Sequence, residues 1–190
     1  TDVELDRIET AGVLTLGGML TSKVQASGFT YSGGASKVRV LALKDSTSFV
    51  TFEGAGSSFV QPLSVISRDG VTMSNVTSSG VVYVDADVDC SGSGSVEGAA
   101  VSSGNSLMTL KGADMVLNGS LSSGLSLTTV QVCSGVSMQL GGSGKDAGSF
   151  VLDRDELSRV SSTGLVLESP SGSITVSAVS SSETSLVSDY

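Results

Sequence analysis

The chain has 190 residues, of which 39% are hydrophobic and 15% charged, and it contains 24 Gly, two Cys and no His or Trp. This balance excludes intrinsic disorder, which requires low hydrophobicity and high charge. A formal net charge of −9 argues against nucleic acid and anionic membranes as partners, because both bind basic surfaces.

Short Val-rich and Thr-rich runs separated by Gly and Ser predict a nearly all-β protein, because these residues favour strands and turns respectively. No useful window shows 3.6-residue periodicity, so we expect negligible helix. In chain order, the expected strands are 13–16, 28–32, 38–43, 48–52, 58–66, 70–74, 81–88, 95–101, 107–110, 114–118, 124–132, 136–140, 148–152, 158–160, 164–167 and 173–179. Their spacing of roughly eight to twelve residues by itself permits a sandwich or a barrel as well.

An imperfect internal repeat favours a different architecture. The phrase L-x2-I-x3-G, followed by a short apolar run, occurs in four related forms: Leu5-Ile8-Gly12, Leu63-Ile66-Gly70, Leu107-Leu110-Asp114 and Leu157-Val160-Gly164. Repeats of this kind indicate a stack of similar units. The sequence therefore predicts one domain over residues 1–190, which folds as an all-β parallel β-solenoid. Each rung should contain about 20–25 residues, so that about eight rungs stack at the usual distance between neighbouring strands. Ile66 and Leu110 are expected to point inward at equivalent sites.

Repeats that reach both ends of the chain predict that the rod continues, because an open strand edge is normally capped or paired. Neither terminus carries a Lys-rich or Pro-rich cover. We therefore expect homotypic association or continuation in a longer chain.

The repeats also resemble a known family. ELDRIETAGVLTLGG, ELSRVSSTGLVLESPSGSITVSAV and VRVLALKDSTSFVTFEGAGSSFVQPLSVISRDGVTMS look like the repeats of very large secreted proteins described as filamentous-haemagglutinin-like or adhesin-like. Together these segments cover roughly two-fifths of the chain. The resemblance implies a right-handed β-helix in an extracellular fibre or surface protein, and it carries over no catalytic residues.

Little in the sequence indicates catalysis. The absence of His removes Ser-His-Asp and Cys-His mechanisms and imidazole metal sites, and no phosphate-binding loop with its following helix is present. Charged residues gather around Glu4, Asp6 and Arg7, and again at 153–159, which indicates a repeated structural element with surface ion pairs. We expect no catalytic site and no cofactor.

Three acids, Asp85, Asp87 and Asp89, alternate along one expected strand. One interpretation is a polar outward face, with Val84, Ala86 and Val88 inward, because side chains alternate along a strand. The other is a weak calcium site, since Ca²⁺ prefers several close oxygen ligands. The pattern departs from an EF-hand loop, which requires Gly at its sixth position and Glu at its twelfth.

The two cysteines, Cys90 and Cys133, lie 43 residues apart, close to one repeat. If one repeat is one rung, they are neighbours within reach of a disulfide. If one repeat makes two rungs, we expect the separation to prevent a bond. Two small buried hydrophobic residues are the remaining interpretation.

Two glycosylation sequons, at Asn75 and Asn118, also lie 43 residues apart. Both could carry glycans on one side of a secreted rod. Alternatively, each Asn simply supplies the turn after a strand.

Together these patterns predict a structural, non-catalytic segment of an extracellular fibre, surface filament or adhesin. The alternatives are a module that binds a glycan or a cell-surface receptor, and a polysaccharide-active enzyme. No apolar run approaches the ~20 residues of a transmembrane helix, so we expect no membrane insertion.

Overall fold

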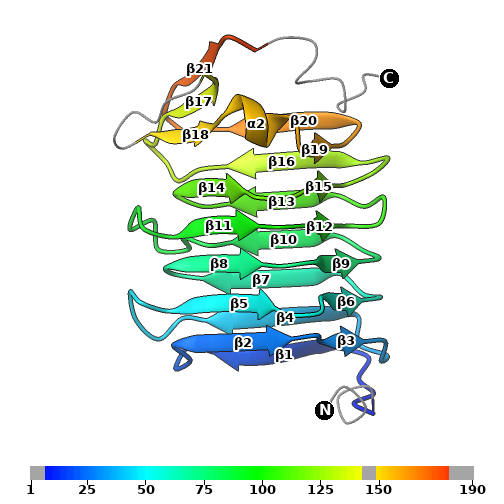
Figure 1. Ribbon diagram of the computed structural model, residues 1–190. Coiled ribbons are helices and arrows are strands. Elements are labelled where there is room, and N and C mark those ends of the chain that lie inside the picture. The colour runs from blue at the N-terminus through cyan, green and yellow to red at the C-terminus, as the bar shows by residue number, and fades with distance from the viewer. Residues whose placement is uncertain (1–6, 143–148, 180–190) are drawn as a thin grey trace.

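The computed structural model describes residues 7–142 and 149–179, and nearly all of its regular elements are parallel strands (Figure 1). The strands form because apolar residues alternate with polar ones, so that each strand has one face to bury. In β4, for example, Val38, Val40 and Ala42 are buried, whereas Lys37 and Arg39 are half-exposed. The expected all-β, parallel fold is confirmed.

Three of the sheets form the body of the molecule. Sheet A consists, in spatial order, of β1 (Val13–Gly18), β4 (Lys37–Ala42), β7 (Leu63–Ser67), β10 (Val82–Asp85), β13 (Met108–Lys111), β16 (Leu127–Gln131) and β20 (Gly164–Glu168). Sheet B consists of β2 (Lys23–Ser27), β5 (Phe49–Glu53), β8 (Gly70–Met73), β11 (Ser95–Gly98) and β14 (Asp114–Leu117). Sheet C consists of β3 (Thr30–Tyr31), β6 (Ser57–Phe59), β9 (Val76–Ser78), β12 (Val101–Ser102), β15 (Leu121–Ser122) and β19 (Val160–Ser161).

Over the first five rounds, the chain visits sheets A, B and C in turn. We call one such set of three strands a rung, so that β1, β2 and β3 form rung 1 and β13, β14 and β15 form rung 5. Figure 1 shows the rungs as successive levels from the N-terminal end to the C-terminal end. Paired residues of sheet A are 19 to 26 residues apart over these rungs, as in Leu63↔Val82 and Val82↔Met108, so the expected rung length is close to the observed one.

The sixth rung is interrupted. After β16 the chain forms β17 (Met138–Gly141), β18 (Phe150–Leu152) and the one helix of the described residues, α2 (Arg154–Leu157), before it reaches β19. β17 pairs with β18 on one side and with β21 (Ile174–Ser177) on the other, in a fourth, three-stranded sheet D. As a result, partners on β16 and β20 are 37 residues apart, as in Thr128↔Leu165.

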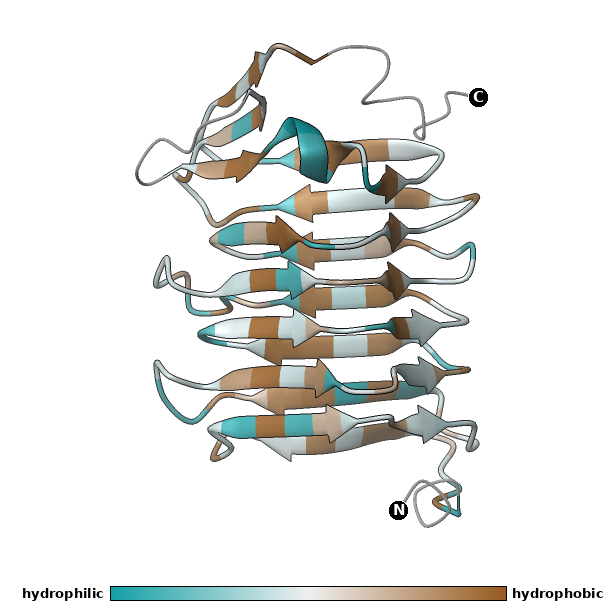
Figure 2. Ribbon diagram, viewed as in Figure 1, coloured by the Kyte–Doolittle hydropathy of each residue, from teal (hydrophilic) through white to brown (hydrophobic). Residues whose placement is uncertain are grey.

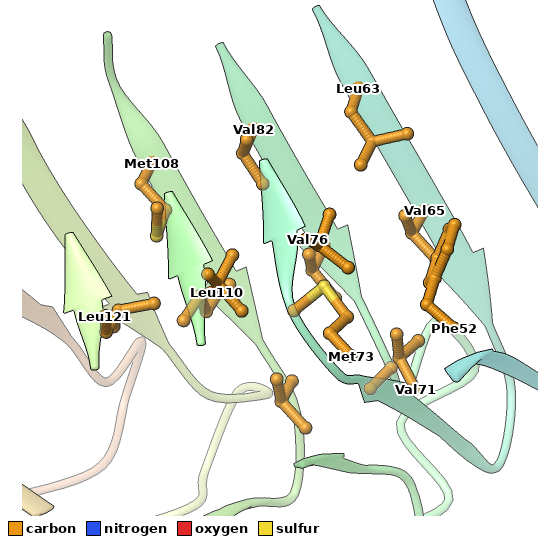
Figure 3. Close-up of a cluster of buried hydrophobic side chains, with 14 of the residues drawn as sticks. Phe52, Leu63, Val65, Val71, Met73, Val76, Val82, Met108, Leu110 and Leu121 are labelled. Atoms are coloured by element: carbon orange, nitrogen blue, oxygen red, sulfur yellow. The ribbon is translucent and has the colours of Figure 1, made fainter. Parts of the chain in front are cut away.

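The core consists of columns of apolar side chains that run across the rungs. Val40, Val65, Val84, Leu110 and Val130 occupy one register position of sheet A, and each is at most 1% exposed. Figure 3 shows side chains of sheets A, B and C gathered in one cluster, including Val65 and Leu110 of sheet A, Phe52 and Met73 of sheet B, and Leu121 of sheet C. Figure 2 shows hydrophobic segments on the strands of successive rungs, as these columns require.

Ile66 departs from the sequence expectation. Leu110 is buried, as expected, but its column partner in β7 is Val65, whereas Ile66 is aligned with Asp85 and Lys111. Ile66 is half-buried on the opposite side of the sheet. The proposed equivalence of Ile66 and Leu110 is wrong by one residue, which in a strand reverses the face.

The four copies of the repeated phrase do not occupy one structural position. Gly70 and Asp114 both begin strands of sheet B, with Ser95 of the intervening rung between them, whereas Gly164 begins a strand of sheet A. The 44-residue interval therefore spans two rungs. Elsewhere, the single strand expected over 58–66 is divided into β6 and β7 by a corner that contains Pro62, because proline cannot donate a ladder hydrogen bond.

Candidate functional site

The three acids of the 85–89 run lie in three different environments. Asp85 is the last residue of β10 and is 3% exposed, Asp87 is 1% exposed, and Asp89 is exposed. Val88, which was expected to point inward, is 37% exposed. The expected strand over 81–88 ends at Asp85, so the alternation that would place all three carboxylates on one outward face does not continue, and that expectation is wrong.

Asp85 forms a buried ion pair on the outer side of sheet A. Its Oδ2 lies 3.0 Å from Nζ of Lys111, the residue directly beside it on β13, and it accepts a hydrogen bond of 3.3 Å from the hydroxyl of Tyr83. Burial, and secondarily the charge of Asp85, raises the pKa of the Tyr83 phenol. The ammonium group of Lys111 in rung 5 compensates the negative charge of the buried Asp85 carboxylate in rung 4.

Asp87 organises the loop between β10 and β11. Its Oδ1 accepts hydrogen bonds from the backbone N–H and the hydroxyl of Ser91, and its Oδ2 accepts one from the N–H of Gly92. These bonds satisfy a carboxylate that is 1% exposed, as burial requires. Within residues 7–142 and 149–179, no group of three or more His, Cys, Asp or Glu residues is placed to hold a metal ion.

Cys90 and Cys133 are joined in a disulfide, with their Cα atoms 5.7 Å apart. The alignment of Asp85 with Lys111 and Gln131 places Cys133 two rungs beyond Asp87, and Cys133 Sγ lies 3.6 Å from the Asp87 carbonyl oxygen. Cys90 itself belongs to the β10–β11 loop, where its φ is 54°. The expectation that a two-rung separation prevents a bond is therefore wrong. The loop reaches rung 6 because the corner of rung 5 is only two residues long, at 112–113.

The two sequon asparagines share one edge of the molecule. Asn75 follows β8 and Asn118 follows β14, so both lie at corners between sheets B and C, two rungs apart, and both are exposed. Asn75 also has a φ of 53°, which is the left-handed conformation that Asn tolerates in turns. Asn75 therefore supplies the turn after β8 and also exposes its side chain, so its two interpretations do not exclude each other.

The charged cluster at 153–159 has structural partners. Asp153 is the N-cap of α2, and Glu156 completes a capping box by accepting a hydrogen bond from the Asp153 N–H. Glu156 is 7% exposed and also accepts from the backbone N–H of Leu117, while Arg159 donates to the Leu117 carbonyl at 2.6 Å. Glu156 is buried, so the expected surface position is wrong for this residue, and both Glu156 and Arg159 bind backbone groups of Leu117. The matching group at Glu4 and Asp6 lies outside the described residues.

A buried column of serine was missed by the sequence analysis. Ser78, Ser103, Ser123 and Ser162 directly follow the outward hydroxyl residues of β9, β12, β15 and β19, and each is at most 3% exposed. The hydroxyls of Ser103 and Ser123 donate to carbonyls of the corner that leads to sheet A, as in Ser123 to Ser126 at 2.7 Å. Ser78 donates to Gln61, in the corresponding corner of the preceding rung, and Ser162 donates to Gly164, the first residue of β20. The sequence signal was a second repeat, apolar-Ser/Thr-Ser, at 76–78, 101–103, 121–123 and 160–162.

The outer face of sheet B carries a shallow depression of about 250 Å³. Phe49, 38% exposed, forms one wall, and Gly70, the next residue of the same outward column, leaves the space beside the ring unfilled. Asp69, Glu97 and several hydroxyl groups line the rest. On its other side, Phe49 is covered by Lys23, whose Nζ lies 5.1 Å from the ring centroid. An aromatic wall with flanking carboxylates and hydroxyls is an arrangement that can bind a polar ring.

None of the helices in the described part of the chain is long and apolar enough to cross a membrane. In comparisons with known proteins, no family model, no curated protein and no solved structure matches the chain.

Proposed function

We propose that the chain is a non-catalytic structural segment of an extracellular fibre, surface filament or adhesin, and that it folds as a right-handed parallel β-solenoid. The main support is the combination of a cyclic A–B–C strand order with apolar columns that continue through successive rungs. Right-handedness follows from the strong preference of parallel crossover connections for that hand.

The proposed role is mechanical. Each internal strand of sheets A, B and C hydrogen-bonds to the rung before and to the rung after, so neighbouring rungs hold one another in place. The stacked core residues, among them Val65, Val84 and Leu110, exclude water along the same axis. Such a quasi-one-dimensional stack resists local opening by proteases and by stretching, because opening one rung exposes the core faces of two neighbours.

An oxidising, extracellular location is supported by the Cys90–Cys133 disulfide, since such bonds persist mainly outside the cytosol. The exposed sequons at Asn75 and Asn118 and the resemblance to filamentous-haemagglutinin-like repeats are in keeping with secretion. The absence of catalysis is proposed because the buried charged groups have structural partners: Asp85 pairs with Lys111, and Glu156 caps α2.

Negative-stain imaging of the native assembly tests this proposal. We expect rods or filaments longer than one chain, joined through homotypic contacts or through further sequence of the same type. Compact, monodisperse particles in the native material would contradict the structural role.

A second candidate, a glycan- or receptor-binding module, is favoured by the depression beside Phe49. Sugar rings stack on aromatic faces, and carboxylates such as Glu97 accept hydrogen bonds from sugar hydroxyls. A glycan array comparing the wild-type chain with Phe49→Ala tests this candidate. Binding that the substitution abolishes would support it, whereas the absence of binding to any glycan on the array would exclude it for those glycans.

A further inference from the structure

The depression on the outer face of sheet B is built by three neighbouring rungs. Phe49 comes from β5, Gly70 and Thr72 come from β8, and Glu97 comes from β11, on successive levels of Figure 1. The register of β5 and β8 places Gly70 directly beside Phe49 in one outward column. The space therefore exists because the middle rung has no side chain next to the aromatic ring.

The Phe49 ring has a cation on one side and the depression on the other. Lys23 of rung 1 lies on the first side, with its Nζ 5.1 Å from the ring centroid. Gly70 of rung 3 and the space above it lie on the second side. An aromatic face carries partial negative charge and attracts cations. Lys23 already uses this attraction, and the side toward rung 3 offers the same attraction to a ligand.

Two carboxylates line the depression, and no cation of the described residues neutralises them. Within residues 7–142 and 149–179, neither Asp69 nor Glu97 forms an ion pair. Glu97 Oε2 accepts a hydrogen bond of 3.5 Å from the Thr72 hydroxyl, and the Asp69 N–H donates to the Ser48 carbonyl at 2.9 Å, so both residues are held beside the space. Two negative charges next to an aromatic face favour a cationic ligand and disfavour an anionic one.

Hydroxyl groups complete the lining and indicate more than a site for a bare cation. Thr72, Ser93 and Ser95 contribute them, from β8, from the loop before β11 and from β11 itself. A hydroxyl both donates and accepts hydrogen bonds, so these side chains match the hydroxyls of a sugar ring. The volume of about 250 Å³ is small for a ligand site and suits one ring rather than an oligosaccharide.

We propose that the depression binds one residue of an amino sugar whose amine is unacetylated and therefore protonated. The sugar ring lies against Phe49, its ammonium group faces Asp69 and Glu97, and its hydroxyls bond to the surrounding Ser and Thr side chains. This inference rests on the glycan-binding candidate and deepens it by naming the class of sugar. An N-acetylated sugar lacks the positive charge, and an acidic sugar is repelled by the two carboxylates, so the same residues select for one class and against the others.

Saturation-transfer NMR of the 190-residue chain with glucosamine, glucose and N-acetylglucosamine, each over a range of concentrations, tests the inference. The three sugars share one ring and differ only in the group on the second carbon: an ammonium, a hydroxyl or an amide. We expect glucosamine to bind more tightly than either neutral sugar by on the order of tenfold or more, the gain expected for one hydrogen bond to a charged group.

Variants of the lining separate the charge from the ring. Asp69→Asn and Glu97→Gln keep the side-chain shape and should each weaken glucosamine binding by on the order of tenfold, with a much smaller effect on glucose. Glu168→Gln is the matched control, because it removes an exposed carboxylate of sheet A and changes the net charge of −9 by the same amount. Phe49→Ala should abolish binding of all three sugars. Phe49 is 38% exposed, and urea unfolding should show that this variant keeps the fold.

Other results would overturn the inference. Equal binding of glucose and glucosamine, lost together in Phe49→Ala, would retain the glycan-binding candidate and overturn the inference alone, whereas no binding of any sugar together with an empty glycan array would overturn both. An equal loss in Glu168→Gln would assign the preference to net charge. Butylammonium that binds as tightly as glucosamine would indicate a site for a bare cation, and neutral sugars that bind only with added Ca²⁺ would indicate a metal-bridged site; each of these results contradicts the proposed selection.

Discussion

Leu110 provides a quantitative test of the column-packed core. Its side chain is fully buried between Val84 and Val130 of the adjacent rungs, whereas Leu107, just before the same strand, is 51% exposed. Leu110→Ala removes about 1.5–3 kcal/mol of burial free energy and leaves a cavity between two strands, so the total cost should reach about 2–5 kcal/mol. Leu107→Ala deletes the same atoms from a half-exposed site and should cost about 1 kcal/mol or less.

Urea unfolding followed by far-ultraviolet circular dichroism measures both free energies of unfolding. The Leu110→Ala midpoint should fall at an unchanged m-value, which indicates a change in stability rather than in the surface exposed. The wild-type spectrum should be dominated by strand signal. If Leu110→Ala were as stable as wild type, or if Leu107→Ala cost as much, the register assigned to β13 would be refuted. Leu110→Asp should be more damaging still, because it buries an unpaired charge.

Three further expectations follow from particular contacts. Gly119→Ala would place a Cβ 1.1 Å from the Ala99 carbonyl oxygen and should cost more than about 4 kcal/mol or prevent folding, whereas Gly18→Ala meets no atom within 4 Å and should change the melting temperature little. Reduction of the Cys90–Cys133 disulfide should lower stability by about 2–4 kcal/mol, measured by thermal unfolding with and without reductant; an unchanged melting temperature would contradict this. Because the pKa of Tyr83 is raised in the folded chain, its contribution is complete below about pH 10 and is lost as pH rises above that value, where the unfolded chain ionises first. Tyr83→Phe should therefore flatten the alkaline fall in stability, and a fall of equal size in the variant would rule out this cause.

The sequence predicted the strands better than their alignment. The expectation that Leu110 points inward is correct, because burial of one face of β13 imposes a two-residue period. In β7 the run Leu63-Ser64-Val65-Ile66 contains an apolar residue on both faces, so the period is ambiguous and Ile66 was assigned to the wrong one. An apolar residue on the outer side is tolerated there because its neighbour in the column, Leu41, is apolar as well.

The functional residues were less predictable because their partners are distant in sequence. The approach of Glu156 and Arg159 to Leu117 depends on the detour through β17 and β18, and no local spacing encodes it. The capping-box pattern Asp153-x-x-Glu156 is nevertheless a sequence signature of a helix N-terminus and would have predicted α2. The disulfide depended on the unequal lengths of two corners, a feature that becomes visible only when the rungs are aligned.

The disulfide also has a consequence for a chain under tension. Cys90 and Cys133 are 43 residues apart in sequence, and the bond withholds that segment from extension. At ~3.4 Å per extended residue, this hidden contour length is roughly 150 Å. When the chain is pulled from its ends, it should therefore unfold rung by rung as far as the bridged segment and then stop lengthening. The disulfide thus protects the segment between the two cysteines, in rungs 4 to 6, from extension. Reductant would release the withheld length as an additional step in a force–extension trace, which makes the bond a redox-dependent limit on how far the chain can be extended.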